Sequence, residues 1–146
     1  MVKTKYSIVI NAPKEKVWDT MLEPKTYQEW TEPFSPGSSY RGSWDKGSKI
    51  IFTDAEGKGG MVSRIADNQL HEFISIEHIG IIQDGKEITE GPEVAKWAPA
   101  FENYTFTEKD GGTEVLVEMD LNEENVEMFA EMWPKALAKL KEVAER

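Results

Sequence analysis

Residues 122–146 read NEENVEMFAEMWPKALAKLKEVAER. Apolar residues recur in this segment at intervals of three and four, the period of an amphipathic helix that buries one face. Asn122 is placed to begin this helix as its N-cap, and glutamates in the first turns with lysines in the second half complement the helix dipole. The pattern predicts one long terminal helix. Its apolar positions are Val126, Phe129, Trp133, Ala136, Leu137, Leu140, Val143 and Ala144.

Part of this helix carries unusually bulky side chains. Met128, Phe129, Met132 and Trp133 fall within one and a half turns, and Pro134 follows at once. Because proline lacks a backbone N–H, we expect the helix to kink at this position. A kinked helix with large, adaptable side chains is typical of a lid over a sheet with a cavity beneath it.

Length and composition narrow the class of protein. A chain of 146 residues predicts a single domain over 1–146, and its formal net charge of −10 argues against binding to nucleic acid or to anionic membranes. The absence of cysteine excludes disulfides, thiol nucleophiles and thiolate metal sites. No signal-like apolar core and no membrane-spanning stretch are present, so we expect a cytoplasmic protein without a membrane span.

The N-terminal part predicts a strand followed by two helices. Residues 3–10 alternate as a strand does, and Asn11-Ala12-Pro13 then begins a helix with Pro13 at its first position. Val17, Trp18, Met21 and Leu22 form the apolar face of that helix, which ends at Glu23-Pro24 before a second short helix over 25–30.

From residue 38 to residue 121 the hydrophobic period changes to two, which predicts a run of six strands. Glycine-rich and Asp/Asn-containing turns separate them, and Asp110-Gly111-Gly112 predicts a hairpin. The segment 83–99 has no clear period and is predicted to be a long loop, which favours a functional role. The predicted strands lie near 40–44 and at 49–54, 61–66, 70–82, 101–108 and 113–121.

The predicted fold class is therefore α+β, with the order strand, two helices, six strands and one long helix. A single antiparallel sheet must bury one face, and the terminal helix offers a matching apolar stripe. This organisation resembles the START-like (SRPBCC) helix-grip superfamily, in particular its branch similar to the C-terminal domain of the activator of heat-shock-protein ATPase. The motifs that carry the resemblance are Ile10-Asn11-Ala12-Pro13 with Val17-Trp18, the glycine turns, Asn103-Tyr104-Thr105-Phe106 with Gly111-Gly112-Thr113, and Trp133-Pro134-Lys135-Ala136-Leu137.

The resemblance implies a fold and a pocket. It implies a curved antiparallel sheet of about seven strands wrapped around the long terminal helix, with a cavity between them. The superfamily has no shared catalytic residues, so the resemblance implies no particular reaction. It also raises a chaperone ATPase as a candidate partner.

The chain has two histidines, which are the first candidates for chemistry. His71 and His78 are seven residues apart in one predicted strand, so they should lie on opposite faces and should not share a metal ion. We expect no metal and no cofactor. His78 is a candidate acid or base, although a strand histidine bonded to a neighbour or to water explains it as well. Gly57-Lys58-Gly59-Gly60 lacks the spacing of a phosphate loop, and Ser75 lacks a nucleophile elbow.

Aromatic residues are the stronger signal for a binding site. Trp97 lies in the long polar loop, where it either helps to form an apolar cavity with the terminal helix or anchors the loop on the surface. We assign no catalytic residue. The candidate ligand-binding residues are Trp44, Phe52, His78, Trp97, Glu102, Tyr104, Phe129, Met132 and Trp133.

Three functions are compatible with this pattern. The first is non-enzymatic binding of a small hydrophobic or amphipathic molecule under the terminal helix. The second is an enzyme of the cyclase or hydrolase type that uses His78 or Glu102 as acid or base. The third, which rests on the resemblance alone, is an interaction protein of a chaperone ATPase. The sequence does not identify the ligand. It is compatible with a monomer or with a homodimer.

Overall fold

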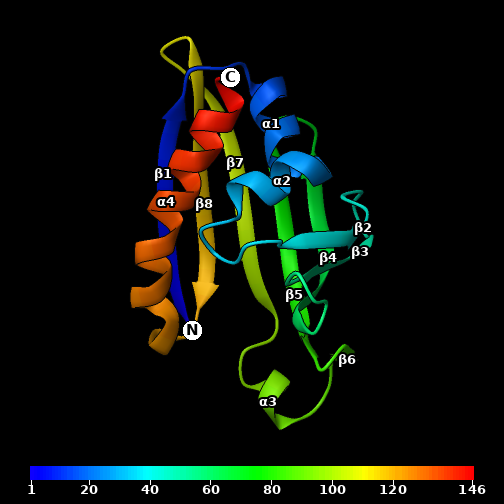
Figure 1. The fold of residues 1–146 in the computed structure, drawn as a ribbon. Coiled ribbons are helices and arrows are strands. Elements are labelled where there is room, and N and C mark those ends of the chain that lie inside the picture. Colours follow the sequence, from blue (N-terminus) through cyan, green and yellow to red (C-terminus); the bar gives the residue numbers. More distant parts are fainter.

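The computed structural model describes residues 1–146 as one antiparallel sheet with helices on one face (Figure 1). The strand order is β1-β8-β7-β5-β4-β3-β2, and the short β6 pairs with β5. This confirms the α+β helix-grip prediction. The strands are β1 (Val2–Ile10), β2 (Ser39–Gly42), β3 (Lys49–Thr53), β4 (Gly59–Gln69), β5 (Phe73–Gln83), β6 (Lys86–Ile88), β7 (Ala100–Lys109) and β8 (Gly112–Leu121).

The long helix α4 lies over β1 and β8, and α1 and α2 extend the helical layer over the same face (Figure 1). The N-terminus lies where β8 ends, and the C-terminus lies at the opposite end of the sheet beside α1. None of the helices combines the length and the hydrophobicity that crossing a lipid bilayer requires. The helices are α1 (Lys14–Leu22), α2 (Pro24–Trp30), α3 (Pro92–Ala95), the 3₁₀ turn η1 (Glu123–Asn125) and α4 (Val126–Ala144).

Alternating side chains of the strands build the core. On β8, Val115, Val117, Met119 and Leu121 are buried, as their period of two predicts, because one face of the antiparallel sheet packs on the helices. The hairpin between β7 and β8 turns at Asp110 and Gly111, which both have positive φ.

The two halves of α4 differ in burial. All of its fully buried residues lie from Trp133 onward, so the second half is anchored in the core while the first half forms a looser wall. The helix continues through Pro134, which cannot donate to the Ala130 carbonyl. Asn122 precedes η1 and makes no side-chain cap bond. The N-cap of α4 is Asn125, three residues later than predicted, and α4 begins at Val126.

The predicted break at Asp67-Asn68, between the predicted strands 61–66 and 70–82, is wrong. A β-bulge follows Ile65, and β4 continues to Gln69 before turning. Asn68 is held in the strand because its amide Nδ2 donates to the Trp44 carbonyl at 2.8 Å. His71 therefore lies in the turn, with φ of 64°. The prediction that His71 and His78 share one strand is wrong, because β5 begins at Phe73.

The predicted loop over 83–99 is also more ordered than expected. It contains β6 and the one-turn helix α3, and β6 raises the number of strands to eight. β6 has three residues and α3 has four, so neither element is long enough to show a hydrophobic period. Pro13 is a smaller correction: it occupies the N-cap of α1, whereas Pro24 begins α2.

Candidate functional site

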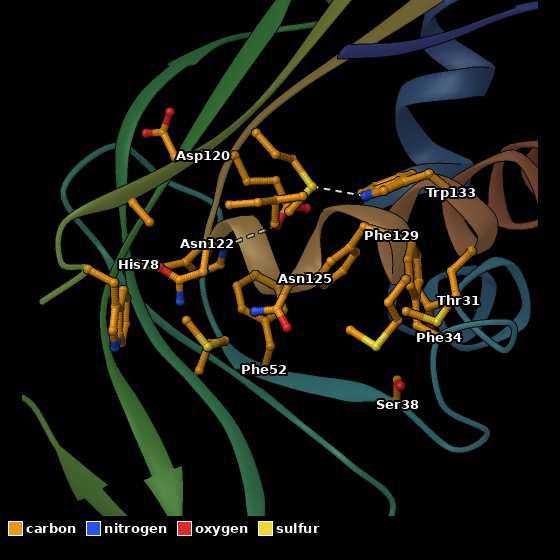
Figure 2. A pocket seen from close by; sticks show the side chains of 18 of the residues that line it. Thr31, Phe34, Ser38, Phe52, His78, Asp120, Asn122, Asn125, Phe129 and Trp133 are labelled. Atoms are coloured by element: carbon orange, nitrogen blue, oxygen red, sulfur yellow. Dashed lines mark hydrogen bonds and ion pairs between the residues drawn. The ribbon is translucent and has the colours of Figure 1, made fainter. Parts of the chain in front are cut away.

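A cavity of about 640 Å³ lies between the sheet, the first half of α4 and the segment 27–38 (Figure 2). This volume is within the range of about 300–1,000 Å³ that is usual for small-molecule sites. Of its 23 lining residues, 16 are hydrophobic. The lining residues come from α2 and the loop after it, from β3, β4, β5, β7, β8 and α4, and from the segment after α3 that carries Trp97. Met1, Asn122 and Asn125 complete the lining.

Trp133 is the centre of the aromatic wall. Its ring lies 4.8 Å from that of Phe34, 6.0 Å from that of Trp30 and 6.2 Å from that of Tyr104, measured between centroids. The indole Nε1 lies 2.9 Å from the Met119 sulfur. Helix α2 and the loop after it thus supply one side of the wall, and α4 supplies the other.

One group of hydrogen-bonded side chains interrupts the apolar lining. The Ser63 Oγ lies 2.7 Å from the His78 Nδ1, and the His78 Nε2 lies 3.0 Å from the Glu102 Oε1. The Tyr104 hydroxyl donates to the other oxygen of Glu102. We call Ser63, His78, Glu102 and Tyr104 the polar array.

Strand pairing brings the polar array together. Ser63 on β4 is directly opposite His78 on β5, and Glu102 on β7 is diagonal to His78 because it pairs with Ile76. A second bulge lies beside His78. His78 and Ile81 therefore both line the cavity, although they are three positions apart and would face opposite ways in a regular strand. Glu77 faces the other way, and its carboxylate lies 2.6 Å from Arg64.

Burial keeps the cavity phenols protonated. Desolvation raises the pKa of Tyr104 well above its ordinary value, and the Glu102 carboxylate raises it further. Desolvation likewise raises the pKa of Tyr27, with the charge of Glu102 as the second cause. Both hydroxyls therefore remain neutral donors at any physiological pH.

Asp120 also borders the cavity, but its carboxylate is already occupied. Burial alone would raise the pKa of Asp120, yet the backbone N–H of Phe101 and the Lys3 ammonium group hold it below the ordinary value. The corresponding distances are 3.0 Å and 2.9 Å. Glu102 also accepts two hydrogen bonds, but no lysine or arginine pairs with it, so it is the carboxylate that remains to bind a donor of a ligand.

The polar array does not form a nucleophilic triad. Ser63 has no exposed surface and does not line the cavity, so its hydroxyl cannot reach a ligand. It orients His78. Glu102 and His78 do line the cavity, where they can bind a polar group or exchange a proton with it.

The structure brings most of the predicted site residues to one place. Trp44 is the exception: its indole Nε1 donates to the Leu22 carbonyl at 3.1 Å, and its ring packs on Tyr40 and Phe52. It caps α1 and lies outside the cavity because β2 ends at Gly42, before the predicted strand does. The predicted residues that line the cavity are Phe52, His78, Trp97, Glu102, Tyr104, Phe129, Met132 and Trp133.

Sequence reasoning missed several lining residues. Tyr27, Trp30 and Phe34 follow one another at intervals of three and four, a spacing that could have marked them as one face. Ser63 gave no signal, since its position opposite His78 depends on strand register.

Comparison with known proteins agrees with this architecture. A family model described as "Activator of Hsp90 ATPase homolog 1-like protein" matches residues 11–145. No match to this sequence is found among curated proteins.

Solved structures share the fold. Protein MLL2253 from Mesorhizobium loti superposes with a TM-score of 0.75 at 16% identity, covering 99% of this chain and 98% of that chain. The Aha1 dimer from Colwellia psychrerythraea superposes with a TM-score of 0.73 at 18% identity, covering 99% of this chain and 97% of that chain. CalU16 from Micromonospora echinospora superposes with a TM-score of 0.67 at 15% identity, covering 97% of this chain and 75% of that chain. The fold and the match over nearly the whole sequence show that this chain belongs to the family of activator of Hsp90 ATPase homolog 1-like proteins.

Proposed function

We propose that the protein binds a small hydrophobic or amphipathic molecule in the cavity under α4. The observation that supports this most directly is an apolar cavity of about 640 Å³ with a hydrogen-bonded carboxylate in its wall. Apolar walls bind the skeleton of a ligand, and a few convergent polar groups orient it.

The energetics of packing support a binding role. Side chains that line an unfilled cavity lose dispersion contacts, and a cavity costs stability in proportion to its volume. The lining residues Phe129 and Met132 are only half-buried, although they lie on the stripe that faces the core. A ligand of matching shape would supply the contacts that these side chains lack.

A cavity-filling variant tests the proposal. Met61 lines the cavity from β4, so the indole of Met61→Trp should occupy part of the space where a ligand would bind. The control is Leu70→Trp, which adds the same indole in the turn after β4, where Leu70 is 66% exposed. Native mass spectrometry and thermal unfolding would be carried out on the wild type and both variants with a library of lipids and aromatic compounds.

We expect the wild type and Leu70→Trp to be stabilised by the same compounds and Met61→Trp to be stabilised less. The bound compound should be recovered with its mass unchanged, which separates binding from turnover. If no compound shifts the wild type, or if Met61→Trp responds as fully as the wild type does, the protein does not use this cavity for binding.

Family membership raises a second function, an effect on the Hsp90 ATPase, because the family description names an activator of that enzyme. The measurement is the rate of ATP hydrolysis by Hsp90 with and without this protein. A rate change that persists in Met61→Trp would separate a surface interaction from cavity binding. An unchanged rate at saturating protein would exclude this second function.

A further inference from the structure

We infer that the polar array selects, among aromatic ligands, those whose polar group donates hydrogen bonds, a hydroxyl or an amine, and that it disfavours carboxylates. This inference rests on the proposed binding function and names the ligand chemistry of the same cavity. It follows from three features of the lining: its unused hydrogen-bonding capacity, its charge and its rings.

The first feature is the hydrogen-bonding capacity that the array leaves unused. Both ring nitrogens of His78 are engaged, one with Ser63 and the other with Glu102. The Tyr104 hydroxyl already donates its hydrogen bond to Glu102. Each carboxylate oxygen of Glu102 accepts one of these bonds and can accept another, so the array offers acceptors to a ligand and no free donor.

Tyr27 adds a hydrogen-bond donor to the same cavity. It lines the cavity, and the structure gives its hydroxyl no hydrogen-bond partner within the protein. Glu102 lines the same cavity, and its negative charge helps to raise the pKa of Tyr27, which keeps this hydroxyl a donor. A ligand hydroxyl can accept from Tyr27 while it donates to Glu102, and an amine can donate to Glu102 directly. A carboxylate can accept from Tyr27, or from the amides of Asn122 and Asn125 that also line the cavity, but it cannot form a hydrogen bond with Glu102.

The second feature is charge. No lysine or arginine lines the cavity, whereas Glu102 and Asp120 do. The Glu102 side chain is only 15% exposed, so its repulsion of another anion is poorly screened by water. The net charge of −10 acts in the same direction. The ammonium group of Met1, which also lines the cavity, already acts on Asp120, so a bound carboxylate would lose its hydration without gaining a lysine or arginine partner.

The third feature is the set of rings. Phe34 and Phe129, at 6.1 Å between centroids, continue the wall around Trp133, and Phe52 lies 6.1 Å from the His78 ring. Aromatic side chains gain most from flat partners that can stack on them or meet them edge to face. The skeleton that suits this lining is therefore a planar aromatic one.

A matched series of fluorescent probes tests the inference: 1-pyrenemethanol, 1-pyrenemethylamine and 1-pyrenecarboxylate, which share one ring system. Fluorescence titration at pH 7 gives the Kd of each probe for the wild type. We expect the alcohol and the amine to bind at least about tenfold more tightly than the carboxylate, a difference of about 1.4 kcal/mol.

Variants assign the preference to the array. Glu102→Gln keeps the size of the side chain and removes its charge, so the amine should bind at least about fivefold more weakly and the carboxylate more tightly. The control is Asp120→Asn, which removes a lining carboxylate outside the array and should keep the ranking. If Glu102→Gln does not fold, the ranking measured on the wild type still decides the inference.

The outcomes separate the two proposals. Equal affinities for the three probes, or tightest binding of the carboxylate, would overturn the inference and leave cavity binding intact. Unchanged affinities of the amine and the carboxylate in Glu102→Gln would also overturn it. If no probe binds and no compound of the wider library stabilises the wild type, cavity binding fails and the inference fails with it.

Discussion

Ser63 on β4 and His78 on β5 are directly opposite each other, and the Ser63 Oγ lies 2.7 Å from the His78 Nδ1. Both residues are buried. The bond fixes the ring of His78, so that its other nitrogen meets Glu102 at the wall of the cavity. Ser63 therefore acts on a ligand only through His78.

Ser63→Ala should lower the free energy of unfolding by about 1–3 kcal/mol, because it leaves a buried ring nitrogen without a partner. Urea denaturation measures this change. Ser75 is the matched control, since it is also buried and its hydroxyl makes no hydrogen bond in the structure. Ser75→Ala should change stability by less than about 0.5 kcal/mol. Equal effects of the two substitutions would contradict the role given to Ser63.

The second prediction concerns alkaline pH and Tyr27. The pKa of Tyr27 is raised by burial in the folded state, whereas an unfolded tyrosine titrates near 10. The folded state therefore binds more protons above pH 10. The stability from this group is complete below pH 10 and is lost as pH rises, by up to about 1.4 kcal/mol per pH unit.

Tyr27→Phe should reduce that loss between pH 10 and pH 11.5 without lowering stability at pH 8, because no hydrogen bond is removed. Tyr104→Phe should reduce the loss as well, but it should also lower stability at pH 8, since it removes the bond to Glu102. Urea denaturation across this pH range compares the two. Parallel stability curves for Tyr27→Phe and the wild type would show that Tyr27 does not contribute.

Much of the fold was predictable because it follows hydrophobic period. The alternation on β8 and the stripe on α4 each bury one face, and these two patterns largely determine a helix packed on a sheet. The elements that were missed are short: β6 and α3 do not repeat a pattern even once.

The site was less predictable because it depends on bulges. The bulge beside His78 changes which residues of β5 face inward, and the bulge after Ile65 moves the turn that contains His71. A shift of one residue in the strand register turns every inward-facing side chain to the other face of the sheet. No local sequence pattern showed where these bulges lie. Trp44 was misassigned for a related reason, since β2 ends before reaching it.

The third prediction concerns the glycine at the start of β4. Gly60 has φ of 152°, and a Cβ atom there would lie 1.8 Å from the Phe52 carbonyl oxygen. Gly57 also has positive φ, but a Cβ atom there would meet nothing within 4 Å. Gly60→Ala should therefore destabilise the protein by at least about 2 kcal/mol more than Gly57→Ala does, as measured by thermal unfolding. Similar losses would show that β3 and β4 can separate at little cost.

The fourth prediction concerns the proline inside α4. Pro134 is exposed and leaves the Ala130 carbonyl without its helical donor. Pro134→Ala restores that donor and should raise the free energy of unfolding by about 1–3 kcal/mol. Lys135→Ala, at the next exposed position, is the control and should change stability by less than about 0.5 kcal/mol. A loss of stability in Pro134→Ala would mean that the bulky first half of α4 needs the proline to reach its place on the cavity.

The fifth prediction separates the two tryptophans of the cavity. Trp133 is 2% exposed, and its ring meets those of Tyr6, Trp30, Phe34 and Tyr104. Trp133→Ala should cost about 3–5 kcal/mol, as removal of a large core side chain does. Trp97 lines the same cavity from the segment after α3, where it is half-buried and makes none of the chain's side-chain hydrogen bonds.

Trp97→Ala should therefore cost less than about 1.5 kcal/mol of stability, while the affinity for a cavity ligand falls at least about fivefold. Thermal unfolding without ligand measures the first quantity, and titration with 1-pyrenemethanol measures the second. A large loss of stability without a ligand would mean that Trp97 anchors its loop, the alternative that the sequence left open. Unchanged affinity with unchanged stability would place the bound ligand deeper in the cavity, against Trp133.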